Sequence, residues 1–304
     1  MRAAVISDGH LVIEERPDPV PGDGEVLIRI AGAGINGADL SQRAGGYPAP
    51  PGWPPDVPGL ECAGTVAAVG AGVLGFAVGD RAMGLLGGGG QAELAAMHER
   101  HALRVPDALD DAQAGGFMEV FATAHDALFA QAALAHGERL LVNGAAGGVG
   151  LAGVQLGVAA GARVTATARH SRDRLEALGA DTMVEGAYDV ILELVGGDNL
   201  VDDVDRLAVG GRLVVIGTGA GSRATLDLRR LMAKRGRIHG SSLRTRPLEE
   251  KALVVQRLGR HVLPLVEAGR VTVPVERTFP LAEAEEAYEA FAAGGKFGKL
   301  VLVP

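Results

Sequence analysis

The hydrophobic pattern of the chain changes near residue 106. Before that point the apolar runs are short and are separated by turn residues, which is typical of β-strands. We interpret five such runs as strands, at residues 3–6, 11–14, 26–30, 64–69 and 81–85. Six prolines between positions 48 and 58 follow Tyr47 and predict an extended, ordered loop. The first third of the chain is therefore predicted to be mainly β-structure.

After residue 106 the pattern becomes helical at 110–135, and strands and helices then alternate. The predicted strands are 140–143, 163–168, 189–194, 212–216 and 237–240, and the predicted helices are 149–160, 171–178, 199–208 and 227–234. Nearly continuous apolar strands are typical of parallel strands covered on both faces. This alternation predicts an α/β fold with an open, doubly wound parallel sheet.

The last part of the chain returns to the earlier style. A strand is predicted at 271–275, a helix at 282–292 and a final strand at 299–303. We expect the final strand to rejoin the first domain. The length of 304 residues and the 47% hydrophobic content agree with two domains, each with its own buried core.

Composition and charge narrow the range of partners and locations. A net charge of −8 without a long basic run argues against nucleic acid as a partner. The only cysteine, Cys62, can form no internal disulfide, which fits a reducing cytoplasm. Asp8 interrupts the amino terminus before a secretory signal could form. The uncharged stretch 140–162 could be interpreted as a membrane span, but its glycines favour a strand, a turn and a buried helix, so no membrane association is expected.

A glycine-rich segment, 144–150 (GAAGGVG), lies between a predicted strand and a predicted helix. In that position Gly147 would let the backbone approach a pyrophosphate, and Gly150 would allow the helix to pack closely on the strand. The helix N-terminus adds unpaired N–H groups and a partial positive charge. We interpret the segment as a dinucleotide-binding turn; the alternative is a turn with a purely structural role.

The end of the second strand of this domain predicts which dinucleotide is bound. A protein selecting NAD would be expected to have an acidic residue there, whereas this chain has Thr167, Ala168 and Arg169. A guanidinium group favours the 2′-phosphate of NADPH through charge-assisted hydrogen bonds. NADPH is therefore the expected cofactor. Arg172 and Arg174 follow, and one of them is expected to be only a solvated position on a helix.

No metal site or nucleophilic triad is predicted. His98 and His101 are three residues apart and have no third ligand near them in sequence, and Cys62 fits a small buried position in a strand. Hydride transfer to an isolated ketone normally needs a Lewis acid or a placed proton donor. A quinone or an enone needs less help because conjugation spreads the developing charge, so acceptors of this class are favoured.

Several motifs together resemble one enzyme family. They are GINGAD at 34–39, GGYP at 45–48, PGLECAG at 58–64, VGDR at 78–81, EVFATA at 119–124, the glycine turn at 144–150 and GKLVL at 298–302. The chain resembles the zinc-independent quinone oxidoreductases, the zeta-crystallin-like branch of the medium-chain dehydrogenase/reductase superfamily. Zinc enzymes of that superfamily have Cys where Asn36 stands and His where Leu60 stands.

The resemblance implies a Rossmann domain at 119–262, inserted in a GroES-like β domain made of 1–118 and 263–304, with a cleft between them. It places Asn36 and Tyr47 at the nicotinamide and substrate, as candidate catalytic residues. It also implies a homodimer that extends the sheet at strand 237–240. The candidate cofactor-binding residues are Thr123, Ala146, Gly147, Gly148, Val149, Thr167, Arg169, Arg174, Val195, Gly217, Thr218, Ser242 and Leu243.

The expected function is NADPH-dependent, zinc-independent reduction of quinones or related conjugated carbonyls. The alternatives are reduction of a 2-enoyl thioester or 2-alkenal, and NADPH binding without turnover. Tyr47 could donate a hydrogen bond to the acceptor or only pack on the cofactor. Asp39 and Glu61 are expected to be structural hydrogen-bonding residues. The segment 181–189 is too short to include the helix that usually separates the third and fourth Rossmann strands.

Overall fold

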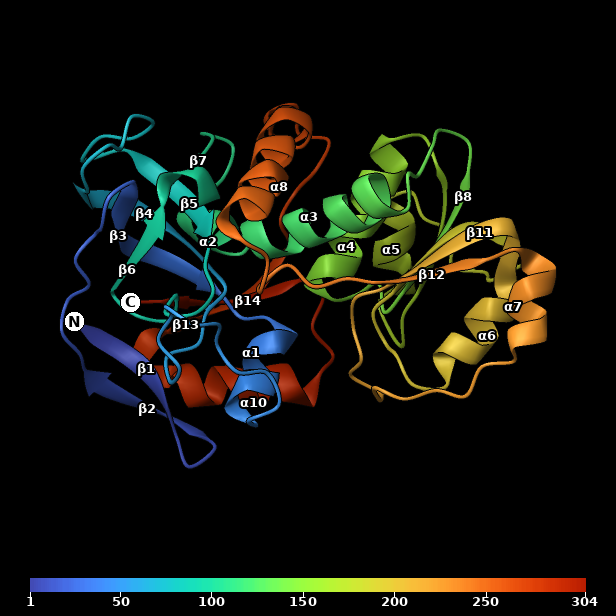
Figure 1. Ribbon diagram of the computed structural model, residues 1–304, viewed down its shortest axis with the longest axis horizontal. Helices are drawn as coiled ribbons and strands as arrows, with labels where there is room; N and C mark the ends of the chain where they lie inside the picture. Colours follow the sequence, from blue (N-terminus) through green and yellow to red (C-terminus); the bar gives the residue numbers. More distant parts are fainter. The chain divides into compact units, whose positions relative to one another are not determined.

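The computed structural model describes residues 1–304, which divide into two compact units. The terminal unit contains both ends of the chain, Met1–Glu119 and Leu243–Pro304 (Figure 1). The central unit is the continuous segment Val120–Ser242. This division agrees with the interruption of one domain by another that the sequence pattern predicts.

The central unit is built on a parallel sheet of five strands in the order β12-β11-β10-β8-β9. The strands are β8 (Arg139–Asn143), β9 (Arg163–Thr167), β10 (Tyr188–Glu193), β11 (Leu207–Val215) and β12 (Arg237–Gly240). The helices are α4 (Gly148–Ala159), α5 (Arg172–Ala177), α6 (Asn199–Arg206) and α7 (Leu228–Lys234), and a helical segment at the start of the unit continues as η2 (Asp126–Gln131). Helices α4 and α5 lie on one face of this sheet and α6 and α7 on the other (Figure 1). The predicted doubly wound sheet is confirmed.

The third strand of this sheet is reduced to one contact. Asp181 forms an isolated parallel bridge with Thr165 of β9, and β10 begins at Tyr188. No helix lies between Asp181 and Tyr188, as the short spacing predicts. The order of the strands is nevertheless that of a doubly wound fold, because the bridge places Asp181 at the outer edge of β9. Across the whole chain, no helix combines the length and apolar character needed to cross a membrane.

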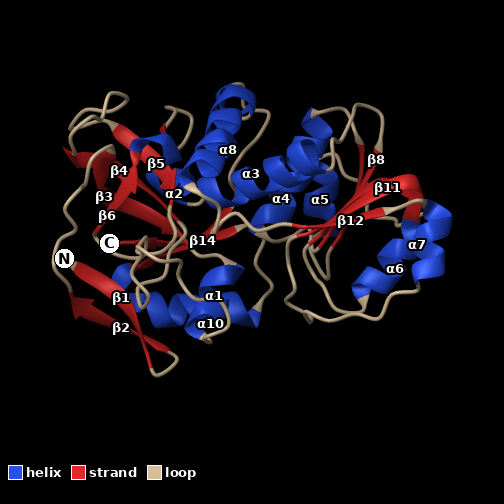
Figure 2. Ribbon diagram, viewed as in Figure 1, coloured by secondary structure: helices blue, strands red, loops and turns tan.

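The terminal unit contains a sheet of seven strands and a separate hairpin (Figure 2). The hairpin is β1 (Arg2–Ser7) with β2 (His10–Glu15). The sheet has β3 (Glu25–Gly34), β4 (Glu61–Val69), β5 (Arg81–Leu85), β6 (Leu94–His98), β7 (Ala102–Arg104), β13 (Val275–Pro280) and β14 (Lys299–Val303). Strand β14 pairs antiparallel with β3, so the final strand rejoins the first domain as predicted.

The helices of the terminal unit surround this sheet. They are α1 (Gly37–Arg43), η1 (Glu99–His101), α2 (Asp111–Gly115), α8 (Leu248–His261), α9 (Leu263–Glu267), η3 (Leu281–Glu283) and α10 (Ala284–Ala293), and α3 (Met118–His125) begins at its border with the central unit. The strand predicted at 271–275 lies instead at Val275–Pro280. Val271 and Val273 are buried in the preceding segment, so their alternation reflects packing and not strand pairing.

The second boundary differs from the one predicted. It lies between Ser242 and Leu243, whereas the resemblance implies 262/263. The reason is α8, which packs on η1 and β7 of the terminal unit. Arg100 forms a two-pronged ion pair with Glu249 at 2.5 and 2.6 Å, and the ring of His101 hydrogen-bonds the carbonyl of Leu248. The first boundary, 119/120, lies within one residue of its predicted place.

Candidate functional site

The glycine turn of the central unit connects β8 to α4. Gly144 has a φ of +73°, a conformation that residues with a side chain rarely adopt. A Cβ on Gly150 would lie 2.6 Å from the Cα of Ala145, so the first turn of α4 packs directly on the glycine turn. These two glycines are thus required by the fold itself.

Gly147 differs, because protein packing does not explain it. A Cβ there would meet nothing closer than the Gly144 carbonyl oxygen at 3.7 Å, which is an ordinary contact. Gly147 is also the N-cap of α4, and the first turn of that helix contains no acidic residue. A bound anion could therefore approach this backbone and its N–H groups closely. The predicted pyrophosphate residues, Ala146 to Val149, lie together at this turn and fit a dinucleotide.

Two further loops meet at the same carboxyl edge of the sheet. The loop after β10 contains Val195, and the loop after β11 contains Gly217 and Thr218. The N–H of Ala220 donates to the carbonyl of Val195 at 2.8 Å, which joins the two loops. Three of the predicted cofactor residues are thereby brought together beside the glycine turn, where ligands bind in doubly wound sheets.

A buried polar network lies at the ends of the strands that lead into these loops. Asn143 ends β8, and its Nδ2 donates to Glu193 Oε2 and to Asp203 Oδ1, both at 2.8 Å. Thr167 donates its hydroxyl to Asn143 Oδ1 at 3.0 Å. The Thr167 side chain is therefore engaged within the protein, and a cofactor would meet mainly its backbone.

The other predicted cofactor residues are more scattered. Arg169 is exposed just beyond β9, and Arg174 is exposed on α5. Thr123 is half-buried on α3. Ser242 is the last residue of the central unit and Leu243, which is buried, is the first residue after it.

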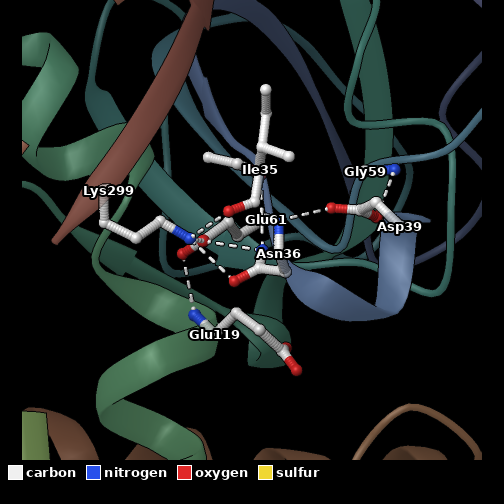
Figure 3. Close-up of polar contacts among 8 residues, drawn as sticks. Ile35, Asn36, Asp39, Gly59, Glu61, Glu119 and Lys299 are labelled. Carbon is white, nitrogen blue, oxygen red and sulfur yellow. Dashed lines mark hydrogen bonds and ion pairs between the residues drawn. The ribbon is translucent and has the colours of Figure 1, made fainter. Parts of the chain in front are cut away.

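The terminal unit contains a second buried polar network, centred on Lys299 of β14 (Figure 3). The ammonium group donates to Glu61 Oε1 and Asn36 Oδ1, both at 2.7 Å, and to the carbonyl of Ile35 at 3.0 Å. Asn36 Nδ2 also donates to Glu61 Oε1 at 3.0 Å and to the carbonyl of Gly34 at 3.3 Å. Both ends of the Asn36 amide are thus occupied by the protein, so this candidate catalytic residue is held rigidly.

Two more acids border this network. Asp39 is fully buried and accepts hydrogen bonds from the N–H groups of Asn36 at 2.8 Å and Gly59 at 3.1 Å. Burial nevertheless raises the pKa of Asp39 to about 6. The carboxyls of Asp39 and Glu61 are both engaged in hydrogen bonds within the protein, and their purely structural role stays a prediction.

Glu119 lies at the start of α3, where its N–H donates to Glu61 Oε2 at 2.9 Å. Figure 3 shows its carboxyl pointing away from Lys299. Burial, together with the negative charges of Glu61 and Asp39, raises the pKa of Glu119 to about 8, and the nearby lysines offset only part of this rise. A carboxyl group in this environment is a candidate proton donor near neutral pH.

Tyr47 is half-buried in the proline-rich loop and is held by Arg244. The guanidinium carbon of Arg244 lies 5.0 Å from the centre of the Tyr47 ring, and the group donates to the Tyr47 carbonyl at 2.9 Å. Arg244 also donates to Gln42 Oε1 at 2.6 Å and to the carbonyl of Gly87 at 2.8 Å. An almost fully buried arginine thus fixes the ring orientation of the second candidate catalytic residue.

The donor set does not fit a zinc ion. No group of three His, Cys, Asp or Glu side chains is arranged to hold a metal. Asn36 and Leu60 provide neither the thiolate nor the imidazole that zinc favours. The carboxylate that contacts the Asn36 side chain is that of Glu61, which is already paired with the Lys299 ammonium.

Sequence reasoning assigned no role to Lys299, Arg244 or Glu119. Lys299 could have been noticed as a charge that opens an otherwise apolar final strand. Arg244 follows directly after the predicted Leu243, and Glu119 begins one of the family motifs, so both lay next to recognised signals. Their contacts depend on residues 58 to 264 positions away, which local patterns do not report.

Two protein-family models match the chain. The alcohol dehydrogenase GroES-like domain matches residues 22–107, and the zinc-binding dehydrogenase family matches residues 156–302. The first match confirms the expected β domain at the amino terminus. The second extends from α4 to the last strand and agrees with the Rossmann-type sheet.

Individual relatives support the same assignment. The chain is 31% identical to human quinone oxidoreductase over 330 residues, covering 100% of this chain and 98% of the relative. It is 35% identical to the polyketide synthase GfsB of Streptomyces halstedii over 293 residues, which are 92% of this chain but only 5% of that protein. A mycobacterial protein solved in complex with NADPH superposes with a TM-score of 0.89 at 26% identity, covering 100% of both chains.

Replacing Lys299 should show how much the terminal unit depends on its ammonium group. In Lys299→Met the Glu61 carboxylate stays buried without its counter-ion, so the free energy of unfolding should fall by about 3–5 kcal/mol. Urea unfolding measures this change. Lys234→Met, on α7 of the central unit, is the matched control and should shift stability by less than about 0.5 kcal/mol. Equal effects of the two substitutions would contradict a special role for Lys299.

Proposed function

Because the chain belongs to the medium-chain dehydrogenase/reductase superfamily and is an oxidoreductase of that superfamily, we propose that it reduces quinones or related conjugated carbonyls with NADPH. The observation that carries this proposal is the full-length similarity to a quinone oxidoreductase, combined with a donor set that does not fit zinc. NADPH would supply the hydride.

The residues of the chain would bind and orient the reactants. The glycine turn at Ala146–Val149 would hold the pyrophosphate, and the loops with Val195 and Thr218 would meet the ribose and nicotinamide. Tyr47, fixed by Arg244, would contact the acceptor. The rigidly held Asn36 would form one wall of the site.

A reaction without zinc is part of the proposal. Where a zinc enzyme would have a metal to stabilise an oxyanion, this chain has Asn36 bonded to the Lys299 ammonium. Acceptors whose developing charge is spread by conjugation suit such a site, because they need less electrostatic stabilisation from the protein. This supports quinones and enones over simple ketones.

A 2-enoyl thioester or 2-alkenal is the second candidate acceptor. It is favoured by the similarity to the polyketide synthase GfsB, since polyketide chains are built as thioesters. The cofactor residues would be the same for both acceptors, and only the contacts around Tyr47 would differ.

A panel of acceptors tests the proposed activity. A quinone, an enone, an enoyl thioester and a simple ketone are each mixed with enzyme and NADPH, and the loss of NADPH absorbance is followed. We expect the quinone to be reduced fastest and the ketone not at all. Tight NADPH binding without oxidation by any acceptor would contradict the proposal and favour a non-catalytic binding protein.

The same panel on Tyr47→Phe separates the two roles considered for this tyrosine. A hydroxyl that donates to the acceptor in the transition state contributes about 1.4 kcal/mol, so its loss should lower kcat/KM about tenfold. Unchanged turnover would mean that the ring only packs. The substitution retains the ring that stacks under Arg244, so the loop should stay in place.

Arg169 is proposed to select NADPH over NADH. In Arg169→Ala the ratio of kcat/KM for NADPH to that for NADH should fall about tenfold, corresponding to ~1.4 kcal/mol, because an exposed guanidinium contributes modestly. Arg172→Ala, an exposed arginine on the following helix, serves as the control and should leave the ratio unchanged. An unchanged ratio in Arg169→Ala would disprove the assignment.

We also propose a homodimer formed through β12. This strand pairs with β11 on one side only, so its other edge has free backbone groups that a second copy could pair with. Sedimentation velocity should give the mass of two 31.1 kDa chains, and the outer amide hydrogens of β12 should exchange slowly with solvent. A single-chain mass at micromolar concentration would contradict the proposal.

A further inference from the structure

Two carboxyl groups lie together beneath the loops of the central unit. Glu193 ends β10 and Asp203 lies on α6, and both are completely buried. The amide of Asn143 donates one hydrogen to each of them at 2.8 Å. Asp203 Oδ2 is buried and has no hydrogen-bond donor of the protein facing it.

No cation forms an ion pair with either carboxyl, although the charge of Arg206 partly offsets the rise in the pKa of Asp203. The neighbouring groups on β8, β9 and the start of α6 are the neutral side chains of Asn143, Thr167 and Asn199. The cations nearest along the packed helices pair with exposed acids. Arg206 of α6 lies 3.7 Å from Asp202, and Arg230 of α7 pairs with Asp205 and Asp227. Two adjacent buried carboxylates without a counter-ion would be strongly destabilising.

The two carboxyls differ in how many hydrogen bonds they accept. Glu193 Oε1 accepts hydrogen bonds from the backbone N–H groups of Val195 and Gly196, and Oε2 accepts from Asn199 at 2.6 Å. All these donors need an acceptor oxygen on Glu193, so a proton on its carboxyl would compete with them. Asp203 has no such donors apart from Asn143, so it is the partner able to hold a proton.

We propose that Asp203 carries a proton that it shares with Glu193, and that the resulting single negative charge on Glu193 holds the turn at Val195 in position for the cofactor. Burial first, and then the hydrogen bond and charge of Glu193, raise the pKa of Asp203 to about 8, which agrees with a proton retained at neutral pH. Glu193 and Asp203 are thus positioning residues, not catalytic ones.

The turn connects the pair to the proposed dinucleotide site. The Val195 carbonyl accepts from the N–H of Ala220, and the N–H of Gly197 donates to the carbonyl of Gly221 at 2.8 Å. Movement of the turn at Val195 would therefore also move the loop that carries Thr218. This part of the inference rests on the proposed NADPH binding, whereas the shared proton does not.

The shared proton can be tested on the protein without cofactor. An Asp with a pKa near 3.9 when unfolded and about 8 when folded binds one extra proton in the native state between these values. Its contribution to the folding constant should therefore fall about tenfold per pH unit across that range. Asp203→Asn should lack this component, because an amide can make the same hydrogen bonds without titrating. Urea unfolding from about pH 5 to pH 9 measures the difference in slope.

Asp202→Asn is the matched control, since it changes an exposed acid on the same helix and should keep the wild-type slope. Infrared spectroscopy adds a direct readout, in which the wild type should show the carbonyl stretch of a buried protonated carboxyl that Asp203→Asn lacks. If Asp203→Asn has the wild-type slope and the infrared band remains, the shared proton is disproved.

Binding of NADPH, followed by calorimetry, tests the link to the cofactor. Wild-type affinity for NADPH should weaken above about pH 8, because loss of the Asp203 proton leaves two adjacent carboxylates beside the turn at Val195. The affinity of Asp203→Asn should not change there. Glu193→Gln should bind about tenfold more weakly at every pH, because a neutral amide holds the N–H groups of the turn less well. Wild-type affinity in Glu193→Gln would overturn the positioning role.

The outcomes also separate this inference from the proposed function. A wild type that binds neither NADPH nor NADH would overturn the proposed function and the positioning role together. The pH slope and the infrared band would still decide whether Asp203 and Glu193 share a proton. If Asp203→Asn fails to fold, although an amide can replace a protonated carboxyl in every bond, the shared proton is likewise overturned.

Discussion

The terminal unit depends on one buried ammonium group. Lys299, near the end of the chain, neutralises Glu61 at 2.7 Å and also holds the Asn36 amide and the Ile35 carbonyl. Removing two charges from water costs several kcal/mol per ion, which only close contact and additional hydrogen bonds offset. The main effect of this interaction is therefore on geometry and less on stability. It fixes how β14, β4 and the segment before α1 meet, and it holds Asn36 in place with them.

Both units bury a glutamate charge, but the charge is compensated differently in each. Each has a buried glutamate at a strand end and an asparagine amide bonded to it, Asn36 to Glu61 and Asn143 to Glu193. In the terminal unit a lysine compensates the charges. In the central unit the second acid is, by our inference, kept neutral by a proton. The proposed proton on Asp203 makes the central network sensitive to pH, and in the terminal unit the raised pKa values of Asp39 and Glu119 do the same beside the Lys299 network.

Much of this architecture could be predicted from the sequence. The central strands and helices follow continuous apolar runs and glycine turns, and their observed bounds lie mostly within one or two residues of prediction. The exceptions have physical causes. The sequence pattern does not predict helix α8, and the second boundary differs from prediction because contacts with Arg100 and His101 place this helix in the terminal unit. The glycine turn was found by its local pattern, but the groups that hold Asn36 and Tyr47, namely Lys299 and Arg244, are joined to them only by folding.

The interrupted terminal unit has a consequence for synthesis on the ribosome. The central unit is a continuous segment that contains all its own strands, so it can fold as soon as Ser242 has left the exit tunnel. The terminal unit has to wait for β14, because until then Glu61 has no counter-ion and the end of β3 at Ala33 and Gly34 has no partner on its β14 side. During that interval the first hundred residues form an incomplete sheet whose β3 ends in unpaired backbone groups, and such groups can pair with another chain.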